Sequence, residues 1–466
     1  MSAMKILVVK TVDPAFDSLH EVFQMLGHDS TLISFRISFV EFKNTVETVE
    51  PDLIVINNTD LFSDCTSPDF QAFSDFLENG KYPVALWDFE APYFVGGPRM
   101  MARWQANDYF RSFLFFHIDT FYVDEYRKHG NSAHYLPFFV DSRMENYRLP
   151  RDYENSFRHE ITYIGTAFSP SIFRDECESD ASLVDYFLLN ARADLVNVVA
   201  TYMVTDLSQE SIQRIDAALF ESYARFFKSD VHDAELTQRL DEALADFVTE
   251  IIAGEISGLQ RRRDILRAVL LSRIRIIYSY FQVASRLEKL GDVDIHVYGE
   301  GEWNRILTAY PRPIRRLSYP ELFAAFHNSH FIFGFTKKLF VNLIHERVFQ
   351  ILGAGGFPLF DHRRDFDLNF EPQTLTTYRS VEEIPEILKF YRKHEGLRNR
   401  QIEKARKQVF SRHTLVHRAE ELLKVSGAHF GISTNSSRVL PYQLNKDWID
   451  GLYHPPKISG NVSPRH

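Results

Sequence analysis

The stretch Glu346–Asp361, ERVFQILGAGGFPLFD, joins a helix to a strand through a glycine-rich turn. Its first half has apolar residues three and four positions apart, which is typical of an amphipathic helix, and Phe357–Phe360 is typical of a buried parallel strand. The glycines between them relieve the sterics of a left-handed turn, and because they lack side chains they also let a ligand approach the backbone. Taken locally, the stretch fits a simple helix-to-strand turn as well as a ligand site.

The alternation of strands and helices continues on both sides of this stretch. From residue 160 onward the sequence predicts strands near 160–165, 294–298, 331–334 and 357–360, and helices near 319–328, 342–353, 381–393, 397–410 and 413–425. Closer to the N-terminus it predicts strands at Ile6–Val9, Asp52–Asn58, Tyr82–Asp88 and Ser112–Phe116. Several of these strands end in polar residues, and the carboxyl ends of strands are where ligands bind in open α/β sheets.

Changes along the chain predict two domains and a tail. Residues 142–159 are polar and lack a clear period, so we place a linker there. We expect an N-terminal Rossmann-like domain at 1–150, on the acceptor side of any two-domain site, and a C-terminal Rossmann-like domain at 151–425. Apolar residues at helical spacing, for example in Ala234–Ile252, predict a helical insertion into the second domain at about 168–260. Residues 426–466 form a C-terminal tail.

The composition indicates a folded protein of enzyme size. The chain has 466 residues, 45% of them hydrophobic and 14% aromatic, and its net charge of -10 argues against nucleic acid as a partner. Cys65 and Cys177 are too few for a disulfide framework and suit a reducing compartment, so we expect a cytoplasmic protein. The sequence has no apolar run of about 18 residues, and we therefore predict no transmembrane segment.

Several motifs, taken in order, resemble one known family. In the C-terminal part they are Tyr163–Gly165, Arg262–Leu266, Tyr298–Trp303, Arg347–Phe349 with the glycine turn, Asp365–Phe370 with Pro372, Tyr378–Arg379, Arg398–Arg400 with Ile402, and His413–Thr414 with Arg418. In the N-terminal half they are Trp87–Pro92 and Leu136–Asp141. In this order the motifs resemble the CgeB-like (spore maturation protein-like) glycosyltransferases of the GT-B superfamily. The resemblance is best over roughly residues 300–425 and is looser in the N-terminal half.

This resemblance implies a GT-B fold, in which two Rossmann-like α/β domains face each other. It also implies a transferase that moves a sugar from a nucleotide-sugar donor to an acceptor hydroxyl without a metal. The donor is then a co-substrate and no cofactor is expected. The acceptor class stays open between a glycan, a lipid-linked molecule and a protein.

The resemblance also assigns residues to the donor. The residues expected to bind it are Gly165, Gly299, Glu300, Gly301, Trp303, Lys337, Glu346, Arg347, Gln350 and Gly355. Glycine turns present backbone N–H groups to a pyrophosphate, and Arg347 and Lys337 are suited to neutralising the leaving nucleoside diphosphate. Many GT-B enzymes have a glutamate at the position of Gln350, which accepts hydrogen bonds from the ribose. Here either ribose recognition differs or Glu346, one turn earlier, contributes.

Four residues of the N-terminal domain are candidates for the base that accepts the proton of the acceptor hydroxyl. Asp88 and Glu90 follow one predicted strand, and His117 and Asp119 follow another as alternatives. Each also has a structural interpretation, because acidic residues after a strand often cap the next helix.

Three further alternatives stay open. The protein is either an enzyme or a non-catalytic nucleotide-sugar or glycan-binding protein that retains the GT-B shell. The triplet Asp365–Asp367 resembles a metal-binding Asp-x-Asp signature, but we expect a solvated or capping role for it. The arginines between Arg261 and Arg275 form either a solvated helix face or a peripheral membrane contact.

Overall fold

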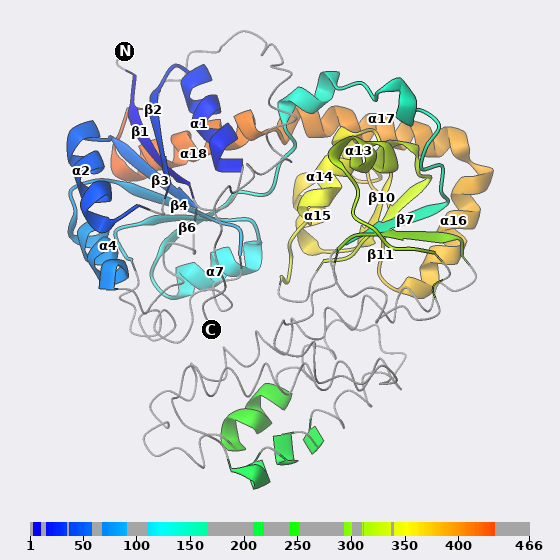
Figure 1. The fold of residues 1–466 in the computed structure, drawn as a ribbon, viewed down its shortest axis with the longest axis horizontal. Helices are drawn as coiled ribbons and strands as arrows, with labels where there is room; N and C mark the ends of the chain where they lie inside the picture. The colour runs from blue at the N-terminus through cyan, green and yellow to red at the C-terminus, as the bar shows by residue number, and fades with distance from the viewer. Residues whose placement is uncertain are drawn as a thin grey trace, which may run out of the picture.

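The computed structural model contains two α/β domains, each built on a parallel sheet (Figure 1). The structure describes residues 3–10, 15–34, 37–57, 68–90, 110–165, 208–211, 213–215, 217–218, 243–251, 293–300, 310, 312–336 and 340–433. Every strand pair recorded in the two sheets is parallel.

The first domain has a six-stranded sheet with the order β2-β1-β3-β4-β5-β6. Its strands are β1 Lys5–Lys10, β2 Asp29–Ser34, β3 Leu53–Asn57, β4 Val84–Asp88, β5 Leu114–His117 and β6 Ser132–Tyr135. Its helices are α1 Ala15–Met25, α2 Phe39–Val49, α4 Pro68–Asn79 and α7 Thr120–Lys128. Side chains alternate along each strand, so Ile6 and Val8 join the core on one face while Leu7 and Val9 join the core on the other. This two-sided burial explains why β1 is an unbroken apolar run.

The second domain has a five-stranded sheet with the order β11-β10-β9-β7-β8. Its strands are β7 Ile161–Ile164, β8 Ile295–Tyr298, β9 Phe331–Phe333, β10 Pro358–Asp361 and β11 Thr377–Tyr378. Its helices are α13 Tyr319–Asn328, α14 Glu346–Gly353, α15 Arg364–Asn369, α16 Ile384–Lys393 and α17 Glu395–Arg412. Short 3-10 helices are η1 Ser142–Asn146, η2 Arg151–Tyr153 and η5 Val381–Glu383.

The two sheets share one strand order. Counted from the first strand of each domain, both run 2-1-3-4-5, and the first sheet adds a sixth strand. In such a sheet the chain reverses its direction of winding between strands 1 and 3, and the crevice at their carboxyl ends is the usual ligand position. In the second domain this switch point lies between β7 and β9.

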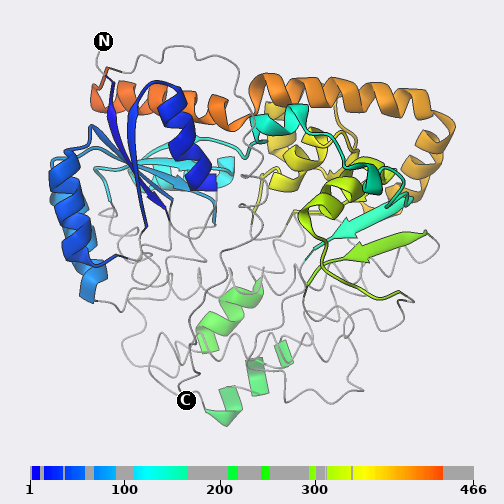
Figure 2. The ribbon, with the colours of Figure 1, turned by 45° about the horizontal axis from the view of Figure 1, so that its top comes forward.

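The C-terminal helix returns to the first domain. Helix α18, Leu415–Phe430, follows α17 along one side of the molecule, and Figure 2 shows the two helices spanning both domains. Leu415, Ala419 and Leu422 are buried in the core of the first domain. The chain crosses between the domains at Val140 and again at Thr414, and these two residues form a parallel bridge.

The predicted fold class, α/β with two Rossmann-like domains, is confirmed. The sequence missed β2 and β6, because both are edge strands with few buried apolar residues, and it missed β11, which has two residues. The last helix begins and ends later than the predicted 413–425. The division at 150 and 425 stays a prediction, and α18, which lies mostly before 425, packs on the first domain.

The predicted insertion at about 168–260 lies mostly outside the described residues. Within it, residues 243–251 are helical, in agreement with the predicted helix Ala234–Ile252. The arginines between Arg261 and Arg275 lie outside the described residues, as does the tail beyond residue 433. None of the helices in the described part of the chain is long and apolar enough to cross a membrane.

Candidate functional site

The switch point of the second sheet brings Gly165 and Arg347 together. Gly165 directly follows β7, and its backbone N–H donates to the carbonyl oxygen of Tyr298 on β8 at 2.9 Å. Arg347 lies in the first turn of α14, and its guanidinium donates to the carbonyl oxygen of Ile164 at the end of β7. A half-buried cation is therefore fixed at the edge of the sheet where ligands bind.

A side chain does not fit at Gly165. A Cβ atom there would lie 2.4 Å from the hydroxyl oxygen of Tyr163, whose side chain is buried. The Tyr163 side chain already occupies the space beside Gly165, so close packing accounts for the glycine at the end of β7.

The N-terminus of α14 points to the same place. His345 caps this helix, and its Nδ1 accepts from the backbone N–H of Arg347 at 3.2 Å. Glu346 is exposed, and Gln350 is half-buried one turn later on the same side of the helix. The partial positive charge of a helix N-terminus, added to the charge of Arg347, favours a phosphate group at this position.

Gly299 and Glu300 end the neighbouring edge strand, β8. Gly299 has a φ of +152°, a conformation that favours glycine, and its N–H donates to the carbonyl oxygen of Arg315 at 2.9 Å. Glu300 is exposed and pairs with Arg316 at 2.8 Å. The structure therefore places Gly165, Gly299, Glu300, Glu346, Arg347 and Gln350 at the carboxyl edge of one sheet. Gly301, Trp303 and Lys337 lie outside the described residues.

The glycine-rich turn is at the other end of α14, where β10 begins. A Cβ atom on Gly356 would lie 2.1 Å from the carbonyl oxygen of Phe326, and one on Gly353 would lie 2.5 Å from Cγ2 of Val140. Gly355 has a φ of +80°. Backbone sterics and close packing account for these glycines. Gly355 and Arg347 are at opposite ends of α14, so the structure does not bring them together.

In the first domain, three of the four candidate bases are buried. Asp88, His117 and Asp119 are each 0% exposed. The Asp88 carboxylate accepts from the hydroxyl of Tyr126 at 2.8 Å and from the backbone N–H of Glu90 at 2.9 Å. Glu90 itself has an exposed side chain.

His117 is held in one neutral tautomer. Its Nδ1 accepts from the backbone N–H of Asp119 at 2.9 Å, so its Nε2 carries the proton and donates to the carbonyl oxygen of Glu90 at 3.0 Å. Burial lowers the pKa of His117 to about 4, which agrees with a neutral ring. Asp88 and His117 thus both fix the backbone of Glu90.

Asp119 links the two domains through hydrogen bonds. It caps α7 by accepting from the N–H of Phe121 at 2.8 Å, and it also accepts from the N–H of Val341 in the second domain at 2.8 Å. Burial raises the pKa of Asp119, while these backbone N–H groups lower it. Asp365, predicted to be solvated or capping, is 0% exposed and belongs to the same contact. No local pattern indicates this role, because the partners are more than 200 positions apart in sequence.

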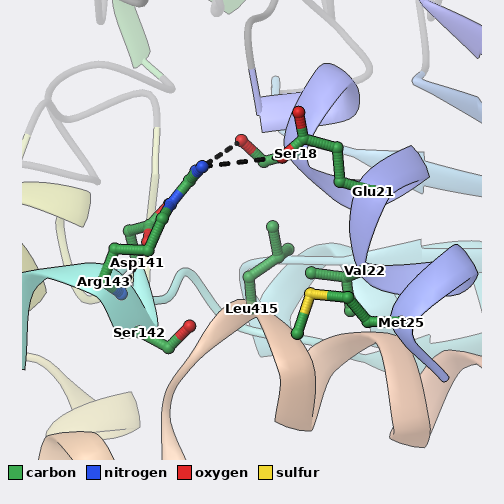
Figure 3. Close-up of a pocket in the computed structure, with 8 residues that line it drawn as sticks. All are labelled: Ser18, Glu21, Val22, Met25, Asp141, Ser142, Arg143 and Leu415. Atoms are coloured by element: carbon green, nitrogen blue, oxygen red, sulfur yellow. Dashed lines mark hydrogen bonds and ion pairs between the residues drawn. The ribbon is translucent and has the colours of Figure 1, made fainter. Parts of the chain in front are cut away.

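A separate small cavity lies where the chain crosses between the domains (Figure 3). Arg143 projects from the crossing beside Asp141, and its guanidinium pairs with Asp141 at 2.6 Å and with Glu21 of α1 at 3.5 Å. The volume of about 10 Å3 has room for at most one water molecule. This cavity is too small for a nucleotide-sugar. Among the described residues, no group of three or more histidine, cysteine or acidic side chains has a metal-binding arrangement.

Residues 281–424 match the model of a family described as glycosyl transferase-like. This segment includes α14, Arg347 and the end of β8. This part of the chain is therefore similar to a glycosyl transferase-like family, in agreement with the predicted class of enzyme. No curated protein matches the chain.

Several solved structures match the chain at low identity. A glycosyltransferase from Rickettsia africae ESF-5 has a TM-score of 0.48 and 8% identity, with 93% of this chain and 100% of that chain covered. Sucrose-phosphate synthase from Thermosynechococcus elongatus has a TM-score of 0.47 and 8% identity, with 92% and 100% covered. Anabaena Alr3699/HepE in complex with UDP and glucose has a TM-score of 0.43 and 10% identity, with 91% and 100% covered. TM-scores below 0.5 do not establish that these proteins share a site with this chain.

Proposed function

We propose that this protein is a CgeB-like glycosyltransferase that moves a sugar from a nucleotide-sugar to an acceptor hydroxyl without a metal. The observation that carries the proposal is the position of Arg347. It lies in the first turn of α14, at the switch point between β7 and β9, inside the segment that matches the glycosyl transferase-like family. Fold alone does not fix the reaction, so the proposal depends on this site.

The donor diphosphate would lie against the N-terminus of α14. When the glycosidic bond to the leaving phosphate breaks, negative charge develops on the nucleoside diphosphate, and fixed positive groups lower the barrier by stabilising that charge. Arg347 and the partial positive charge at the N-terminus of α14 supply this positive charge here. Glu346 or Gln350 would accept the hydrogen bonds of the ribose hydroxyls.

The acceptor would approach from the first domain, with Glu90 as the base. Of the four candidates, Glu90 has an exposed side chain, whereas Asp88, His117 and Asp119 are buried and hydrogen-bonded. A base has to be within hydrogen-bond reach of the acceptor hydroxyl. Asp88 and His117 would act as positioning residues, because both bind the backbone of Glu90. The acceptor class is a glycan, a lipid-linked molecule or a protein.

The test is release of nucleoside diphosphate that depends on both donor and acceptor, measured with a panel of nucleotide-sugars in the presence of EDTA. We expect turnover by the wild type and a fall of about tenfold or more in kcat/KM for Arg347→Ala. Arg347→Lys should recover part of the loss, since it keeps the charge but not the forked geometry. Arg400→Ala, on an exposed face of α17, is the matched control.

Three outcomes would contradict the proposal. If no nucleotide-sugar is bound or turned over, the chain is not a glycosyltransferase. If a nucleotide-sugar binds but is never turned over, the chain is a non-catalytic binding protein with a GT-B shell, an alternative that the amide at Gln350 favours. Turnover that EDTA abolishes would overturn the metal-free mechanism.

A further inference from the structure

A loop of the second domain is seated on the first domain by apolar and polar contacts. The bridging loop, residues 340–345, leads from the region after β9 into α14. Phe340 and Leu343 are buried in the core cluster of the first domain. The backbone N–H groups of Val341 and Asn342 donate to the carboxylate of Asp119 at 2.8 and 3.2 Å. The start of the candidate donor helix is therefore tied to the acceptor-side domain.

A second carboxylate completes this contact. The Thr120 hydroxyl donates to Oδ1 of Asp365 at 2.6 Å and accepts from Nδ2 of Asn342 at 3.0 Å. Asp365 stands at the start of α15, and its backbone N–H donates to the carbonyl oxygen of Asn342 at 3.2 Å. Asp119, Thr120, Asn342 and Asp365 thus form one hydrogen-bonded cluster, which we name the interdomain latch.

We propose that the interdomain latch is a proton-dependent positioning device that holds the bridging loop, and with it the start of α14, on the first domain. Asp119 and Asp365 are its positioning residues. The part of this proposal that concerns catalysis rests on the proposed function, because it assumes that α14 binds the donor.

The charges around Asp365 give the direction of the pH dependence. Burial first, and then the charge of Asp119 at the cap of α7, raise the pKa of Asp365 to about 7, although Thr120 and Tyr135 on β6 lower it through hydrogen bonds. Arg418 on α18 faces Tyr135 and lowers the pKa of that phenol, which burial raises. Since burial disfavours the ionised form of Asp365 in the folded contact, the latch is strongest below the ordinary aspartate pKa of about 4. It weakens as the pH rises to about 7 and weakens no further above that.

The first experiment measures hydrogen exchange of the segment 340–345 in the full chain, at pH 6 and pH 8.5, corrected for intrinsic exchange rates. The amides of Val341 and Asn342 report the contact directly, because Asp119 is their acceptor. We expect protection to fall about tenfold from pH 6 to pH 8.5 in the wild type. The reason is that pH 6 lies one unit below the Asp365 pKa of about 7, and one pKa unit is a tenfold change in the equilibrium. Equal protection at the two pH values would overturn the proposal.

Variants separate the latch from general unfolding. Asp365→Asn cannot ionise but still offers an oxygen to Thr120, so its protection should persist at pH 8.5. Asp367→Asn, on the same helix but with an exposed side chain that pairs with His362, should follow the wild type. Thr120→Val removes the bridging hydroxyl and should lose protection already at pH 6. If Asp365→Asn loses protection at pH 8.5 as the wild type does, Asp365 is not the titrating group.

The second experiment measures KM and kcat for the nucleotide-sugar across the same pH range. The KM should rise from pH 6 to about pH 7 in the wild type and level off above that, and it should stay low in Asp365→Asn, with a smaller change in kcat. A purely structural role would lower the amount of active enzyme and leave KM unchanged, and that result would overturn the coupling to the donor. If no variant turns over any donor, the proposed function fails, while the exchange experiment still decides whether the latch exists.

Discussion

At the scale of single residues, the acceptor side illustrates how burial distributes roles among neighbouring acids. Two strands are followed by the four candidate bases, Asp88, Glu90, His117 and Asp119. From the sequence alone, all four are candidates for the base. In the structure, Asp88, His117 and Asp119 are buried and hydrogen-bonded, and the side chain of Glu90 is exposed. Strand ends are visible in a sequence because apolar runs stop there, but the direction of a side chain past the strand depends on the fold.

Glu90→Gln tests this assignment. The amide has nearly the same shape but cannot accept a proton, so kcat should fall by about 10²- to 10⁴-fold while the KM for the donor changes little. Glu47→Gln on α2 is a matched control, because Glu47 is a surface residue that pairs with Lys43. Initial rates at saturating donor and acceptor make the measurement. A Glu90→Gln enzyme that retains half of the wild-type kcat would show that another group takes the proton.

At the scale of elements, α14 has two ends with different functions. Its N-terminus carries Arg347 at the switch point, and its C-terminus passes into the glycine-rich turn at the opposite edge of the sheet. The sequence predicted the helix, the turn and β10, because helical spacing, glycines and an apolar run are local signals. It could not predict that the glycines contact Phe326 and Val140, since those residues come from other elements.

Gly356→Ala distinguishes packing from ligand contact at this turn. The new Cβ would lie 2.1 Å from a backbone carbonyl oxygen, so the chain has to shift, and the free energy of unfolding should fall by about 1–3 kcal/mol or more. Gly396→Ala in α17 meets its nearest atom at 3.6 Å and should change stability by at most about 1 kcal/mol, in the favourable direction. Urea unfolding gives both values. If Gly356→Ala leaves stability unchanged and weakens nucleotide binding, the turn is part of the donor site.

At the scale of the whole molecule, the two chain crossings hold the domains together. His413 and Arg418, on the C-terminal crossing, contact the first crossing and α15. Arg418 donates to the carbonyl oxygens of Pro137 and Phe138 at 2.8 and 3.0 Å, and also to Nδ1 of His413 at 2.7 Å. The sequence predicts the order of elements because each is encoded locally. The contacts of Arg418 with Pro137 and Phe138 join residues about 280 positions apart, and no local pattern encodes them.

His413 makes the stability of this crossing depend on pH. Burial first, and then the charge of Arg418, lower the pKa of His413 to about 3. Between the ordinary histidine pKa of about 6.5 and that value, the unfolded chain binds a proton that the native His413 does not, so this residue makes the free energy of unfolding fall as the pH falls.

His413→Gln should be less stable at pH 7, because it loses the contact with Arg418. Its stability should also fall less steeply on acidification, by up to about 1.4 kcal/mol per pH unit. Urea unfolding at pH 7, 6 and 5 measures the slope, with His429→Gln at an exposed position of α18 as the control for losing a histidine. An unchanged slope in His413→Gln would mean that the crossing does not exclude the proton, and that other buried histidines set the acid limit of the fold.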